Sequence, residues 1–179
     1  MMEDMKMVNK KNTSGFTLME LMVVIAIIAI ISGIAIPSFL SMLPKSRLRS
    51  ATRDIVSCLQ EMKLRAIREN ATTVVIFNLA NDEYTAFVDN GPGAATGNWA
   101  LDATDTIIKR IVLPPDIDLY DSGFTLSPNT FGYDDRGLPG NNSFGSVSLT
   151  YNNKDYRKVT VNFAGNIRVQ KSSDGANWN

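Results

Sequence analysis

The side chains that could carry chemistry in this sequence are carboxylates and cations, because it contains no histidine and a single cysteine, Cys58. Without histidine neither a Ser-His-Asp triad nor a Cys-His pair can form, and the commonest general acid and base is missing. Cys58 has no partner for an internal disulfide, and it is predicted to be a small buried side chain. We therefore do not expect an enzyme, and a hydrolase tethered to a membrane is the remote alternative.

Glu20 is the carboxylate with the most unusual setting. It is the only charged residue between positions 16 and 43. An ionised carboxylate inside a bilayer costs a few kcal/mol on insertion scales. We therefore expect Glu20 to have either a function or a partner of opposite charge. The formal net charge of the chain is zero, with 18 basic and 18 acidic side chains, so partners have to be predicted from local charge.

The segment around Glu20 is long enough to cross a membrane. A hydrocarbon core of roughly 30 Å needs about 20 helical residues, and residues 16–36 supply them. Lysines at positions 6, 10 and 11 precede the segment, which favours a cytoplasmic N-terminus and places the rest of the chain on the other side. A removed signal peptide and a plain membrane anchor are alternatives, but the small residue Gly15 precedes the apolar run, whereas a signal peptidase site follows one.

Residues 15–20, GFTLME, followed by an uninterrupted apolar run, resemble the class III leader of type IV pilins and type II secretion pseudopilins. The resemblance implies that prepilin peptidase removes residues 1–15 by cutting between Gly15 and Phe16, and that Phe16 is then N-methylated. It makes Glu20 the fifth mature residue, paired with the ammonium of Phe16 on a neighbouring subunit or its own. Pro37 matches the proline that the family tends to place at the twenty-second mature position.

Helical and strand periodicities predict an α+β fold, with a long N-terminal helix packed on an antiparallel sheet head. Residues 16–44 form the transmembrane or filament-core half of the helix, with a kink expected at Gly33 and Pro37. Residues 45–70 form an amphipathic half with one apolar stripe and an opposite basic face. We expect this face to be a solvated surface, with attraction to anionic lipid headgroups as the alternative. Residues 71–179 form the head, with strands predicted at 73–79, 84–88, 107–113, 146–151, 157–163 and 166–170. The polar residues 171–179 are expected to fray.

The last fifty residues, including FGYDDRG at 131–137 and GNIR at 165–168, resemble the H-type pseudopilins and related minor pilins (the GspH, FimT and FimU group). Some members of this group bind DNA through a G-R-x-R motif, but Asn166 replaces the first arginine here. A DNA-binding minor pilin is thus the alternative function, with nucleic acid an unlikely partner. Its candidate contacts are Arg157, Lys158, Arg168 and Lys171.

Some pseudopilins of the major type hold calcium, but the aspartates of this head do not have EF-hand spacing. We expect them in turns and at strand ends, and we predict neither a metal nor a cofactor. These residues are Asp116, Asp118, Asp121, Asp134 and Asp135.

The resemblance implies a structural minor pilin or pseudopilin that supports protein secretion or pilus biogenesis. It implies single-pass insertion in the bacterial inner membrane with a periplasmic head, followed by assembly near the tip of a pilus or pseudopilus. The expected partners are other pilin subunits, prepilin peptidase, the inner-membrane assembly platform and membrane lipid. A single cysteine disfavours a major pilin, because those usually close the C-terminal region with a disulfide.

Overall fold

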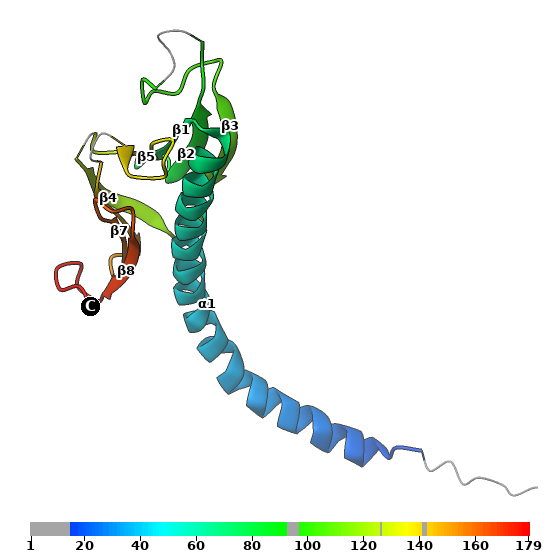
Figure 1. Ribbon diagram of the computed structural model, residues 1–179. Helices are drawn as coiled ribbons and strands as arrows, with labels where there is room; N and C mark the ends of the chain where they lie inside the picture. Colours follow the sequence, from blue (N-terminus) through cyan, green and yellow to red (C-terminus); the bar gives the residue numbers. More distant parts are fainter. Residues whose placement is uncertain (1–14, 93–96, 126, 141–142) are drawn as a thin grey trace, which may run out of the picture. The chain divides into compact units, whose positions relative to one another are not determined.

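The computed structural model describes residues 15–92, 97–125, 127–140 and 143–179 (Figure 1). Nearly all of the predicted leader, residues 1–14, lies outside the described residues. The described chain contains a 52-residue helix, α1 (Leu18–Glu69), followed by eight strands. The strands are β1 (Thr72–Asn78), β2 (Glu83–Asp89), β3 (Thr106–Val112), β4 (Asp118–Phe124), β5 (Thr130–Tyr133), β6 (Gly145–Tyr151), β7 (Asp155–Val161) and β8 (Ile167–Ser172). The predicted α+β class is confirmed.

The chain forms two compact units, Met1–Ser41 and Met42–Asn179. The described part of the first unit is the N-terminal half of α1, and helical backbone continues through Gly33 and Pro37. Its large apolar side chains are exposed to solvent within the chain, beginning with Phe16 at 82%. This half of the helix therefore has no packing partner among the residues described.

In the second unit the remainder of α1 buries one apolar stripe. The buried residues recur every three or four positions, which places them on one side of a helix. They are Leu48, Ala51, Thr52, Ile55, Cys58, Leu59, Met62 and Ala66. The helix ends where Asn70 adopts a positive φ of 50° and the Ala71 N–H bonds to the Ala66 carbonyl at 3.2 Å, a Schellman-type stop with asparagine in place of the usual glycine.

The strands form two antiparallel sheets of four, in the orders β3-β2-β1-β5 and β4-β6-β7-β8. The strands predicted at 73–79 and 84–88 correspond to β1 and β2, which form the hairpin expected from the turn residues 81–83 between them, and β6, β7 and β8 form a meander. Both sheets contribute side chains to one core with the helix stripe, among them Tyr84 and Phe131 from the first sheet and Leu149 and Val159 from the second. The expected single sheet is thus two sheets that share a core with the helix.

Strands β4 and β5 were not predicted. In β4 the aspartates Asp118 and Asp121 weaken strand propensity, and a register shift between Leu119 and Asp121 breaks the alternation of buried and exposed residues. Strand β5 contains Gly132, where an added Cβ would collide with the Thr73 carbonyl oxygen and the Trp99 ring. Contacts made by distant residues therefore decide both strands.

Residues 171–179 were predicted to fray, but in the structure they are ordered. The backbones of Lys171 and Asn179 exchange two hydrogen bonds of 3.0 Å each. The Asp174 carboxylate accepts hydrogen bonds from Ser172 Oγ and from the backbone N–H groups of Ala176 and Asn177. The Lys158 ammonium lies 4.0 Å from the centre of the Trp178 ring. Local polar contacts and one cation–π contact thus fold this segment back on β7 and β8.

Candidate functional site

The predicted cleavage site lies in non-helical backbone directly before α1. Residues 15–17 are not helical, Gly15 and Phe16 are exposed, and a Cβ added at Gly15 would meet no atom within 4 Å. The peptide bond between Gly15 and Phe16 is therefore open to a protease from the side of the described chain. Cleavage there stays a prediction.

Thr17 caps the helix, and this explains part of the local sequence. Its Oγ1 accepts a hydrogen bond from the Glu20 backbone N–H at 3.2 Å. The pattern Thr17-Leu18-Met19-Glu20 is that of a capping box, in which the third helical residue is glutamate or glutamine. An acidic side chain in the first turn also complements the helix dipole. Glu20 thus lies where a capping box and the helix dipole both favour an acidic residue, a local reason that was not predicted although the T-x-x-E pattern signals it.

Residues 16–42 expose an extended apolar surface. The helix α1 is long and apolar enough to cross a membrane, and its most apolar stretch is not buried by the rest of the described chain. A contiguous apolar surface of this size marks a membrane or protein interaction site. Gly33 and Pro37 lie within it in helical backbone, and a kink at these residues stays a prediction.

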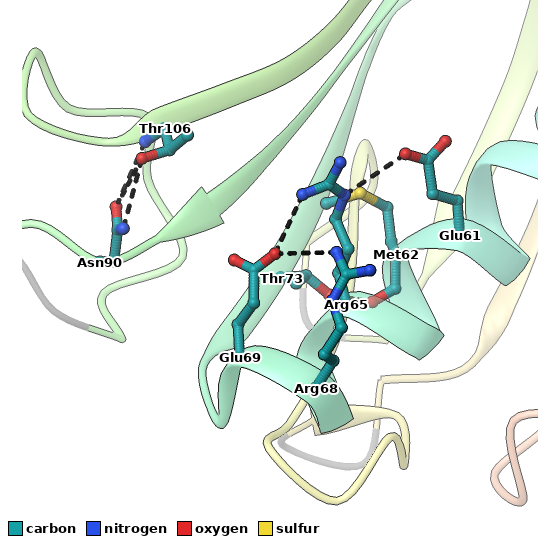
Figure 2. Close-up of polar contacts among 8 residues, drawn as sticks. All are labelled: Glu61, Met62, Arg65, Arg68, Glu69, Thr73, Asn90 and Thr106. Atoms are coloured by element: carbon teal, nitrogen blue, oxygen red, sulfur yellow. Dashed lines mark hydrogen bonds and ion pairs between the residues drawn. The ribbon is translucent and has the colours of Figure 1, made fainter.

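The second half of α1 is tied to the head by polar contacts as well as by its apolar stripe. The buried Thr73 hydroxyl of β1 donates to the Met62 carbonyl at 3.1 Å (Figure 2). Near the start of the unit, Arg47 pairs with Asp116 at 3.0 Å. These contacts fix the helix against residues more than ten positions away in the chain, so the second half belongs structurally to the head.

Part of the predicted basic face of α1 is neutralised by its own helix. Arg65 lies between Glu61 and Glu69, at 3.3 and 2.9 Å, and Arg68 reaches Glu69 at 3.3 Å (Figure 2). Exposed pairs of this spacing contribute a few tenths of a kcal/mol each. Among the described cations of the helix, Arg49, Arg53 and Lys63 take part in no ion pair, whereas Lys45 and Arg47 pair with residues of the head.

The four residues considered for DNA contact do not form one cluster. Arg157 and Lys171 are cross-strand partners in β7 and β8, on the same side as the buried Val159. Lys158 and Arg168 alternate to the opposite side of the sheet. These four candidates by themselves thus place two cations on each face, fewer than the several phosphate contacts that nucleic-acid binding requires.

The five aspartates do not converge either. Among the residues described, no three acidic, histidine or cysteine side chains form a group that could hold a metal ion. Asp116 pairs with Arg47, and Asp134 accepts hydrogen bonds from the backbone N–H groups of Arg136 and Leu138 inside its own loop. Asp118 begins β4 as expected, whereas Asp121 lies within that strand.

Cys58 is buried in the core, as predicted. Burial raises the pKa of its thiol to about 11, the nearby Lys109 ammonium opposes this rise, and Glu61 adds to it. The thiol is therefore protonated at neutral pH and unsuited to nucleophilic chemistry. Burial likewise raises the pKa values of Tyr84 and Tyr133, so these groups also stay neutral.

Two family models match the chain. Residues 10–36 match the prokaryotic N-terminal methylation motif, and residues 51–165 match the type II transport protein GspH. The chain is 30% identical over 172 residues to the pilin-like protein PilA1 of Thermus thermophilus, covering 87% of this chain and 97% of that protein. It is 28% identical over 120 residues to the type IV major alpha-pilin of Moraxella bovis, covering 55% and 76%.

Solved structures share the fold. The minor pseudopilin EpsH from the type 2 secretion system of Vibrio cholerae superposes with a TM-score of 0.52 at 13% identity, covering 69% of this chain and 95% of that one. The type IV minor pilin FimU of Pseudomonas aeruginosa gives a TM-score of 0.51 at 12% identity, covering 68% and 91%. The similarity in fold includes the head, which the predicted leader alone does not specify.

Proposed function

Because the chain belongs to the GspH family of type IV pilin-like and type II pseudopilin proteins, we propose that it is a minor subunit of a pilus or pseudopilus, placed near the filament tip. Members of the pilin family are structural proteins without enzymatic activity, and the methylation motif implies processing by prepilin peptidase. The chain acts by assembling with other pilin subunits, in support of protein secretion or pilus biogenesis.

One observation carries the proposal. The N-terminal half of α1 exposes a nearly continuous apolar surface interrupted by one charge, Glu20, three residues into the helix. In the inner membrane, lipid covers this surface before assembly. In a filament, the helices of neighbouring subunits replace the lipid, so the same side chains are buried in both states.

The charge of Glu20 fixes how neighbouring subunits align along their helices. Cutting after Gly15 creates an ammonium on Phe16, four positions before Glu20. A carboxylate buried among apolar helices is tolerated when an ammonium pairs with it, and removing one partner of such a pair typically costs about 3–5 kcal/mol. A subunit docked out of register would leave both charges unpaired and is disfavoured by an energy of that order.

The first test is the mass of the N-terminus of the protein isolated from membranes, with and without active prepilin peptidase. We expect a product that begins at methylated Phe16 only when the peptidase is active. A product that retains Gly15 in both samples, or one that begins after the apolar run, would contradict processing and with it the assembly mechanism.

The second test separates the pairing role of Glu20 from its capping role. Glu20→Gln keeps a residue that suits the third position of a capping box but removes the charge, whereas Thr17→Ala removes the cap and keeps the charge. We expect Glu20→Gln to insert in the membrane but to be lost from sheared filaments, and Thr17→Ala to assemble. The reverse result would show that helix capping, rather than charge pairing, explains Glu20.

A further inference from the structure

A cationic pocket opens in the second unit beside the first turns of α1 that follow the apolar run. It has a volume of about 300 Å³ and lies between residues 45–49 of α1, the start of β7 and the segment from the end of β8 to Asn179. Four cationic side chains line it, against one acidic side chain. These are Lys45, Arg49, Arg157 and Lys171, with Asp155.

The positive charge of the pocket is largely uncompensated. Asp155 lies 4.0 Å from the Lys45 ammonium. Within the described part of the chain, Arg49, Arg157 and Lys171 take part in no ion pair. Burial lowers the pKa of Arg157, and the positive charge of Arg49 lowers it further, while Asp155 opposes both. The Arg49 guanidinium therefore lies close enough to Arg157 to destabilise the charge of Arg157.

The walls of the pocket are ordered by contacts elsewhere in the head. Arg157 and Lys171 are cross-strand partners, so their side chains leave the same side of β7 and β8. The backbone bonds between Lys171 and Asn179 hold the last segment in place, and Leu48 at the pocket floor belongs to the buried stripe. The cations are thus presented by a rigid frame, which lowers the cost of ordering them around a ligand.

The position of the pocket along the chain indicates which anion it meets. Residues 18–43 of α1 cover about 39 Å, which is close to the thickness of a bilayer with its headgroups, about 40–45 Å. Lys45 follows this stretch directly, and Arg49 comes one turn later. Moreover, Lys45, Arg47, Arg49 and Arg53 concentrate positive charge on the predicted periplasmic side, against the usual bias toward cytoplasmic lysine and arginine.

We propose that this pocket binds the phosphate of an anionic phospholipid headgroup while the subunit is inserted in the inner membrane. Two guanidinium groups suit the oxygens of a phosphodiester, because each presents a planar pair of N–H donors. The lipid would neutralise the repulsion between Arg49 and Arg157 and fix the base of the head at the membrane surface. Extraction into a filament would release the lipid.

The inference rests on the membrane-inserted stage of the proposed function but not on cleavage after Gly15. A chain that binds the lipid yet fails to assemble would contradict the proposed function alone. A chain that is cleaved and assembles, yet shows no preference for anionic lipid, would contradict only this site.

The test uses the full chain in zwitterionic detergent, titrated with phosphatidylglycerol or phosphatidylcholine and followed by native mass spectrometry. We expect phosphatidylglycerol to bind with at least about tenfold preference, and the double variant Arg49→Gln/Arg157→Gln to weaken its binding by roughly tenfold or more. The control Arg53→Gln/Arg68→Gln removes the same number of positive charges, both from α1 outside the pocket, and should stay within about twofold of the unchanged chain. Thermal melting verifies the fold, and Lys171→Gln, at an exposed residue, replaces the double variant if that unfolds.

Equal losses in the two double variants would overturn the site in favour of general attraction between the basic chain and the lipid. No preference for phosphatidylglycerol would overturn it outright. Displacement of the lipid by an equal concentration of inorganic phosphate would show a phosphate site and overturn the lipid as its source. Normal lipid binding by the pocket variant, with loss of filament assembly, would assign the cations to an acidic surface of a neighbouring subunit instead.

Discussion

The two halves of α1 have the same secondary structure but find their partners in different places. Residues 18–41 expose nearly all of their apolar side chains within the chain, whereas residues 42–69 bury one stripe against two sheets. An apolar surface that the chain itself does not cover has to be covered by lipid or by other subunits. One continuous helix can therefore belong to a folded domain in one half and present a surface for other molecules in its other half.

The largest expected effect comes from shortening a side chain of the buried stripe. Leu59 is fully buried, so Leu59→Ala should lower the free energy of unfolding of the head by about 2–5 kcal/mol, because it leaves a cavity. The matched change Ile28→Ala, in the exposed half, should alter it by less than about 0.5 kcal/mol. Urea unfolding in detergent, followed by the fluorescence of Trp99 and Trp178, measures both. Similar losses would contradict the division of the helix.

The reactivity of a cysteine thiol distinguishes the buried side of residues 42–69 of α1 from their exposed side. Because burial raises the pKa of Cys58 to about 11, it should carry at least about a hundredfold less thiolate at pH 8 than an ordinary cysteine. Alkylation by iodoacetamide should therefore be slow in the native protein and fast in urea. Ser57→Cys/Cys58→Ala moves the thiol to the exposed side, where native alkylation should be fast. Equal rates for the two thiols would mean that the stripe is open to solvent.

The same pKa makes the head sensitive to alkali. The folded state favours the protonated thiol, so this contribution to stability is complete below the ordinary thiol pKa and is lost as pH rises toward about 11. We expect the urea midpoint to fall between pH 9 and 11, and to fall less in Cys58→Ala. Tyr84 and Tyr133, whose pKa values are also raised, account for the fall that remains in this variant.

A smaller difference in stability is expected between a glycine substitution in the head and one in the exposed half of α1. Gly132→Ala places a methyl group against the Thr73 carbonyl and the Trp99 ring, so it should destabilise the head by about 1–3 kcal/mol. Gly33→Ala, in the exposed half, meets no atom within 4 Å and improves helix propensity, so head stability should be unchanged. Thermal melting of both variants provides the measurement. If Gly132→Ala melts like the unchanged chain, the Trp99 contact is not tight.

The smallest effect concerns the ion pair at the start of the head. Arg47 and Asp116 are 3.0 Å apart, but half of the arginine side chain is exposed, so Arg47→Gln should cost at most about 1 kcal/mol. The cost should shrink further at 1 M salt, since screening weakens the pair. Arg53→Gln, on the same helix without an ion pair among the described residues, is the control. A loss well above 1 kcal/mol would show that the pair orients the head on the helix.

Much of the protein followed from local sequence. The residues around Gly15 and Glu20 indicated the family, and the three-to-four spacing of Leu48 to Ala66 predicted the buried stripe. The hairpin of β1 and β2 and the existence of strands β6, β7 and β8 were also correctly predicted. These features depend on periodicity and on short motifs, which are properties of neighbouring residues.

Only the tertiary structure decided the rest, because it depends on residues far apart in the chain. Strand β4 exists through its pairing with β6 despite its aspartates, and the glycine of β5 is required by a tryptophan more than thirty positions away. The candidate DNA contacts were separated onto two faces by alternation along β7 and β8. The same alternation brought Arg157 and Lys171 to Arg49 of the helix, so the cationic pocket exists only in the folded head.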